Sequence, residues 1–121
     1  MTGKEIAANL RGTTLEWGHH FLHRKTMLGV DQYCVLGIKA HEHGIPNEVL
    51  EAVDMEGNIV EDNSVVQKPY HDSYEIRTRL SMLYNLNDRS DSKESLIRQL
   101  ESGYAEYNFP VEEFIEYLKT K

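Results

Sequence analysis

Three histidines close together are the residues of this chain best suited to chemistry. They are His19, His20 and His23, with Glu16 about one helical turn before them. If residues 14–25 form a helix, these side chains share its polar side, where histidines at i and i+4 can bind one metal ion. The H-E-x-x-H pattern of zinc proteases is missing, because position 20 is not Glu. Our main prediction is therefore that the chain has no metal site. The three histidines are the candidate residues of an alternative function, a metal-binding or hydrolytic one.

Cys34 is the other side chain with reactive potential. It lies in the most apolar predicted helix, where a thiol is usually an inert small hydrophobe. As the single cysteine, it cannot form an internal disulfide. The chain also lacks the glycine-rich motifs that bind phosphates, and no pair of carboxylates is distinguished by its position. We predict no catalytic residue and no cofactor.

The charge balance is acidic, with 20 Asp and Glu against 13 Lys and Arg and a formal net charge of −7. This balance disfavours nucleic acids and anionic membrane surfaces, which are bound by Lys and Arg. It allows a basic protein partner, since complementary charge speeds association. The alternative for any acidic group is an ordinary solvated surface. The predicted partner-binding residues are Glu112, Glu113 and Glu116 near the C-terminus, and Glu56, Glu61 and Asp62 in the middle.

The length of 121 residues predicts a single domain, residues 1–121. Apolar residues make up 40% and charged residues 27%, as in globular proteins. No apolar run approaches the roughly 20 residues that a membrane span needs, and the first residues lack the apolar core of a signal peptide. Together with the lone cysteine, these features favour the cytoplasm.

Hydrophobic periodicity predicts a mainly α protein, a compact bundle of about five helices. Residues 1–12 are expected to form a frayed arm or a short helix. The S/T-x-x-E spacing of Thr13 and Glu16 is that of a capping box and predicts a helix over 14–25. Residues 32–43 are apolar all round, which predicts a buried central helix. That helix would be capped by Asp31 and followed by Gly44.

The middle of the chain allows two interpretations. Residues 46–54 have helical spacing and favour a third helix. The alternative is a short β-hairpin near 49–61, in which residues 49–54 return through 56–58 into 59–61. Residues 61–69 lack a clear period and predict a surface loop.

The C-terminal half carries clearer stripes. A helix is predicted to begin at an acidic cap near Asp72 and to end near residue 85. One apolar stripe then spans 96–107 and another spans 111–118, with a break at 108–110. Two stripes so close together predict a C-terminal helical hairpin, which the rest of the chain must cover.

The two ends of the chain carry a resemblance. Leu15-Glu16-Trp17-Gly18 near the start and the run from Tyr104 to Tyr117, with its Asn108-Phe109-Pro110-Val111-Glu112-Glu113 segment, resemble a family of small bacterial domains of unknown function. Residues 48–69 do not match that pattern. Relatives of this kind occur beside secreted polymorphic toxins, which implies an immunity role. The resemblance brings no catalytic residues.

The sequence leaves three possible functions to be tested. The chain is expected to be an immunity protein that binds and neutralises a basic toxin domain without catalysis. The first alternative is a small metal-binding or hydrolytic enzyme that uses His19, His20 and His23. The second is a structural or oligomeric partner protein, with the tyrosine-rich C-terminal region as its interface.

Overall fold

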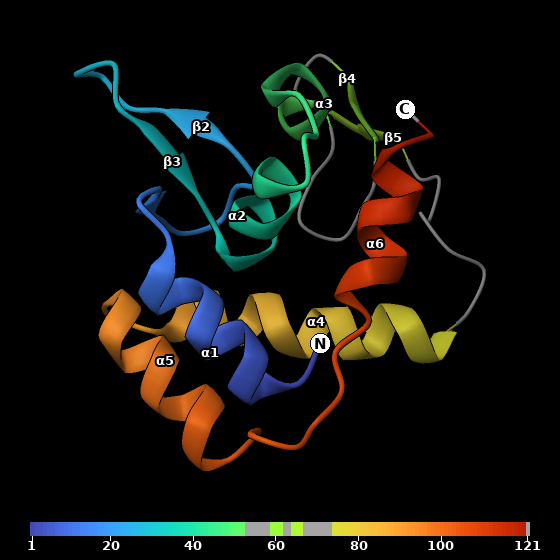
Figure 1. Ribbon diagram of the computed structural model, residues 1–121. Coiled ribbons are helices and arrows are strands. Elements are labelled where there is room, and N and C mark those ends of the chain that lie inside the picture. Colours follow the sequence, from blue (N-terminus) through green and yellow to red (C-terminus); the bar gives the residue numbers. More distant parts are fainter. Residues whose placement is uncertain (53–58, 62–63, 67–73, 121) are drawn as a thin grey trace.

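The computed structural model describes residues 1–52, 59–61, 64–66 and 74–120, and the structural statements below concern these residues. Helices dominate, so the prediction of a mainly α protein is confirmed (Figure 1). The helices are α1 (Gly3–Gly12), α2 (Val35–Glu42), α3 (Asn47–Glu51), α4 (Tyr74–Arg89), α5 (Lys93–Ser102) and α6 (Val111–Leu118). The strands are β1 (Glu16–Trp17), β2 (Arg24–Lys25), β3 (Asp31–Tyr33), β4 (Ile59–Glu61) and β5 (Ser64–Val66).

The first helix, α1, confirms the helical alternative for residues 1–12. It begins at a capping box, in which the Glu5 amide donates to Thr2 Oγ1 and the Thr2 amide donates to the Glu5 carboxylate. The helix packs along α5 (Figure 1). An ion pair between Arg11 and Glu101 also joins the two helices.

The predicted helix over residues 14–25 is wrong, because this segment contributes two strands to a small sheet. β1 pairs in parallel with β3, and β2 pairs antiparallel with β3, in the order β1-β3-β2. Tertiary contacts override the capping pattern: the Trp17 indole donates to Asn87 on α4, and Leu22 is buried in the core. Between them, His20 has φ 71°, a left-handed conformation that interrupts a right-handed helix.

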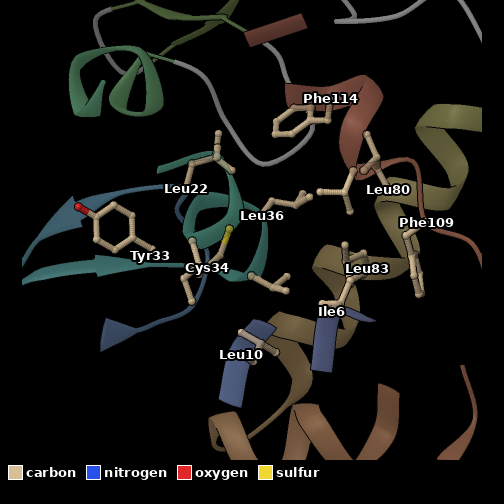
Figure 2. Close-up of a cluster of buried hydrophobic side chains, with 14 of the residues drawn as sticks. Ile6, Leu10, Leu22, Tyr33, Cys34, Leu36, Leu80, Leu83, Phe109 and Phe114 are labelled. Carbon is tan, nitrogen blue, oxygen red and sulfur yellow. The ribbon is translucent and has the colours of Figure 1, made fainter. Parts of the chain in front are cut away.

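The central position of α2 is confirmed. It packs against α1, α4, α6 and β3, and Leu36, Ile38 and Ala40 are fully buried. Figure 2 shows side chains from α1, α4 and α6 around Leu36. Gly37 lets the chain at Leu22 pass in contact with α2, since a Cβ at Gly37 would lie 1.8 Å from the Leu22 carbonyl oxygen.

The start of α2 differs from the prediction. The helix begins at Val35, because residues 31–33 extend as β3. Cys34 is therefore the N-cap in place of Asp31, and its Sγ accepts a hydrogen bond from the Gly37 amide at 3.4 Å. Gly44 follows the helix at φ 84°, as its predicted role requires.

The middle of the chain fits neither interpretation completely. The short helix α3 covers part of the predicted helix over 46–54. β4 does pair antiparallel, but with β5 and not with the described residues 49–52. The prediction of a surface loop over 61–69 is therefore wrong at β5. Residues 53–58 and 62–63 lie outside the described residues.

α4 is the longest described helix, with 16 residues. It continues one turn past the predicted end near residue 85, to Arg89. Its predicted cap at Asp72 lies outside the described residues. No helix in the described part of the chain is long and apolar enough to cross a membrane.

The predicted C-terminal hairpin is not confirmed, although α5 and α6 both exist. α5 packs on α1, whereas α6 packs on α2 (Figure 1). α5 ends at Ser102, and Tyr104 and Tyr107 lie in the connection to α6. The first residues of the chain bond to this connection: the Gly3 amide donates to the Tyr107 carbonyl at 3.1 Å. These contacts explain why the second stripe does not fold back on the first.

Asn87 is a fully buried polar residue that joins the sheet to the helices. Its Oδ1 accepts hydrogen bonds from Trp17 Nε1 at 2.6 Å and from the Val35 amide at 2.9 Å. Its Nδ2 donates to the Gly18 carbonyl at 3.1 Å and to the Asp88 carboxylate at 3.2 Å. The side chain thus ties β1, the start of α2 and the end of α4 together.

Gly37→Ala should destabilise the protein strongly, because its Cβ would overlap the Leu22 backbone, which cannot move as a flexible side chain can. We expect a loss of about 2–4 kcal/mol in the free energy of unfolding, measured by urea denaturation. Gly12→Ala is the matched control, since nothing lies within 4 Å of its added Cβ. Equal stability of the two variants would contradict the close contact between α2 and Leu22.

Asn87→Ala should also be costly, because it removes the acceptor of two N–H groups and leaves them without a partner. Each such group costs about 1–3 kcal/mol when buried, so we expect a loss of about 2–5 kcal/mol in urea denaturation. Asn85→Ala is the control, since Asn85 is exposed on the same helix. A loss no larger than that of the control would show that the amide does not join these elements.

Candidate protein-binding site

The predicted carboxylates on α6 are exposed, but two of the three are paired within the chain. Glu112 lies 2.9 Å from the Met1 ammonium, and Glu116 lies 3.1 Å from the Lys119 ammonium. Glu112 and Glu116 line an open pocket of about 350 Å³ whose walls carry basic as well as acidic side chains. Glu113 has no ion pair among the described residues and is exposed to solvent.

The second predicted acidic group cannot be joined to the first. Glu56 and Asp62 lie outside the described residues. Glu61 ends β4, and only its backbone is described. The prediction that Glu56, Glu61 and Asp62 form a partner-binding region therefore stays a prediction.

The three candidate histidines do not share one face, because they lie on no helix. His19 Nε2 is 2.6 Å from the Ser90 carbonyl, so this nitrogen carries the proton. His20 contacts Asp88 twice, through its amide at 2.9 Å and through Nδ1 at 3.3 Å. His23 is buried elsewhere. Among the described residues, no group of three or more His, Cys, Asp or Glu side chains could hold a metal ion.

His23 connects the β2–β3 hairpin to α3. Its buried ring is hydrogen-bonded through Nε2 to Asp31 Oδ1 at 2.8 Å. Its Nδ1 lies 2.9 Å from Glu51 Oε1, close enough for an ion pair. The angle of this second contact does not suit a hydrogen bond, and Nδ1 has no hydrogen-bond partner in the described part of the chain. We therefore treat the Glu51 contact as electrostatic only.

Cys34 is not suited to nucleophilic chemistry. Burial raises the pKa of its thiol to about 12, although hydrogen bonds from backbone amides oppose this effect. The thiolate, which is the reactive form, is thus nearly absent at neutral pH. The side chain serves as the N-cap of α2.

A β-hairpin formed by β2 and β3 projects from the helical body (Figure 1). Its loop is closed by the Thr26 amide, which donates to the Val30 carbonyl at 2.8 Å. Gly29 adopts φ 81° in this loop, a conformation that glycine accepts without steric cost. The loop therefore has a defined turn structure.

The outer end of this hairpin is apolar and faces solvent. Met27 is 104% exposed and Leu28 is 92% exposed, so neither side chain touches the body of the protein. Phe21 and Val30 are also exposed large apolar residues. Phe21 precedes β2 at the base of the hairpin, where its carbonyl accepts a hydrogen bond from the Cys34 amide. Met27, Leu28 and Val30 lie together in the loop, and we call them the hairpin tip. Grouped exposed apolar side chains of this kind can mark an interaction site.

The sequence contains a signal for the hairpin, a glycine in a short segment between two possible strands. The interpretation of residues 14–25 as a helix left no place for it. Met27, Leu28, Gly29 and Val30 form the turn between the two strands. Gly29 near the centre of a short segment between two polar strand ends is typical of a hairpin loop. The exposure of Met27 and Leu28 has no such signal, because apolar residues in a loop can equally point into the core.

Comparisons of the chain with family models, with curated proteins and with solved structures gave no match. The site is therefore described by its own geometry alone.

The Asp31 carboxyl should give the fold a measurable pH dependence. The hydrogen bond from His23 lowers the pKa of Asp31 below its ordinary value, although partial burial opposes the effect. A carboxyl whose pKa is lower in the folded state stabilises the fold above its unfolded pKa, and this contribution is lost as the pH falls through the folded pKa. Asp31→Asn should therefore be less stable than the parent at neutral pH, and the difference should close as the pH falls through the lowered folded-state pKa of Asp31.

Urea unfolding at a series of pH values measures this difference. Asp91→Asn is the matched control, since Asp91 is exposed and has no hydrogen bond or ion pair among the described residues. This variant shows how the loss of a carboxylate without such a contact affects stability over the same pH range. A gap between the parent and Asp31→Asn that stays constant over the whole range would show that the His23 contact does not depend on the Asp31 charge.

Proposed function

We propose that this chain is a protein-binding domain that acts without catalysis and uses the hairpin tip as its anchor. The observation that carries the proposal is the full exposure of Met27 and the near-full exposure of Leu28 at the end of an ordered hairpin. Apolar anchors that become buried at the centre of an interface supply much of the affinity of protein complexes. Two such side chains held in water without a contact in the chain are suited to that role.

The way the hairpin is held supports the same function. β3 is paired on both edges, with β1 and with β2. The buried His23 adds a contact to Asp31 on β3 and another to Glu51 on α3. A loop already fixed in one conformation loses less entropy on binding than a flexible one. The tip is thus presented in a preorganised form.

The nature of the partner is proposed from charge and from the resemblance at the two ends of the chain. A net charge of −7 attracts a basic protein at long range. Glu113, exposed on α6, adds a local charge that no described residue neutralises. Toxin domains that act on nucleic acids carry basic surfaces, and an immunity role is what the resemblance implies. We therefore propose that the partner is a basic toxin domain, which this protein neutralises by binding.

The combined change Met27→Ser and Leu28→Ser tests the anchor. Both side chains are exposed, so stability should change by less than about 0.5 kcal/mol per site. Affinity for the partner should fall by about 2 kcal/mol or more, which is roughly 30-fold. The partner is sought among the products of the genes that flank this one, by co-expression and rescue of growth, and affinity is then measured by calorimetry.

An exchange of the two side chains, Met27→Leu with Leu28→Met, is the matched control, because it keeps the apolar surface and should bind like the parent. Glu113→Lys separates steering from anchoring, since it should slow association in a way that salt removes. Full protection by the serine variant would contradict the proposal. So would a dimer of the parent that the serine variant converts to monomer, because the tip would then join copies of this chain.

A further inference from the structure

A second pocket, of about 330 Å³, opens at the base of the hairpin. Its walls are Trp17, Gly18, His19, His20, Arg24 and Gln32. None of these residues is acidic, although the chain as a whole has a formal net charge of −7. The volume is within the range of small-molecule sites. We propose that this pocket binds the oxyanion group, phosphate or carboxylate, of a small molecule.

Arg24 supplies the positive charge for such a ligand. Its Nε donates to Gln32 Oε1 at 3.3 Å, and its guanidinium lies 5.7 Å from the centre of the Phe21 ring. These contacts orient the side chain. They leave both terminal amino groups without a hydrogen bond to any described residue. A guanidinium oriented in this way can bind two oxygens of a phosphate or carboxylate at once.

The rings of the two histidines in the pocket are each held by the protein through one nitrogen. His19 Nε2 is held by the Ser90 carbonyl, and His20 Nδ1 is held by the Asp88 carboxylate. His19 Nδ1 and His20 Nε2 have no described partner, and each can donate to an oxyanion when its ring carries a proton on both nitrogens. The His20 backbone, at φ 71°, is in a region that residues other than glycine rarely adopt. Strained positions of this kind persist where neighbouring contacts hold them, and they cluster at ligand sites. Here the holding contacts are the two from Asp88.

The nearest carboxylates do not occupy the pocket. Asp88 is engaged by His20 and by Asn87, and Glu16 accepts a hydrogen bond from Gln32 at 2.9 Å. Neither residue is part of the pocket wall. Each carboxylate accepts hydrogen bonds that position residues of the pocket wall. Binding at this pocket is independent of the protein partner proposed above.

The test uses the purified full chain and inorganic phosphate, with acetate as the carboxylate arm. Trp17 is the single tryptophan and lines the pocket, so its fluorescence reports on occupancy. We expect saturable binding of one of the two anions, phosphate or acetate, with a dissociation constant on the order of 1 mM. NMR shifts of the His19 and His20 rings should accompany it. The arm that binds more tightly identifies the oxyanion.

Arg24→Gln should weaken binding roughly tenfold or more, since a charge-assisted hydrogen bond is lost. Lys25→Gln is the matched control, because it removes the same charge one residue away and outside the pocket wall. His20→Asn gives a second variant, with a side chain that tolerates positive φ, and should also weaken binding. No saturable change with either anion up to about 20 mM, or equal weakening by Arg24→Gln and Lys25→Gln, would overturn the proposal.

Discussion

The buried amide of Asn87 is the interaction on which the arrangement of sheet and helices depends. A fully buried amide must have its hydrogen bonds satisfied, or each unpaired group costs about 1–3 kcal/mol. Here the partners are Trp17 and Gly18 on one side and the first amide of α2, at Val35, on another. All of them must be in place together for the amide to be paired. The sheet, α2 and the end of α4 therefore form one cooperative unit.

The end of α4 extends the same organisation outward to the surface. Asp88, the next residue, holds the strained His20, and the Ser90 carbonyl holds the His19 ring. Trp17, fixed by Asn87, packs edge-on against His19 with ring centres 4.5 Å apart. The buried Asn87, the half-buried Asp88 and the buried Ser90 thus determine the shape of the pocket at the base of the hairpin. The pocket exists because the core requires this contact, and its polar groups are positioned before any ligand arrives.

Sequence patterns predicted the elements that are determined by interactions between residues close together in the sequence. The all-round apolar segment at Leu36 is the central helix, and the stripe at Phe114 belongs to a real helix. The segment 14–25 was predicted as a helix because its capping box is a short-range signal. Its true conformation depends on Asn87, about 70 residues away, and no periodicity reports such a contact. For the same reason, the three histidines were predicted as one patch that the fold separates, and the exposed hairpin tip was not among the predicted site residues.

The three histidines predicted as one patch have different positions and contacts in the fold. His19 and His20 stand at the pocket, whereas His23, three positions later, is buried between Asp31 and Glu51. An imidazole in this position anchors the base of the hairpin against α3, so the exposed tip is carried by a rigid support. A flexible loop that exposed two large apolar side chains would fold them back onto the protein, since burial of apolar surface is favourable. The support opposes that collapse, and Met27 and Leu28 stay exposed to solvent.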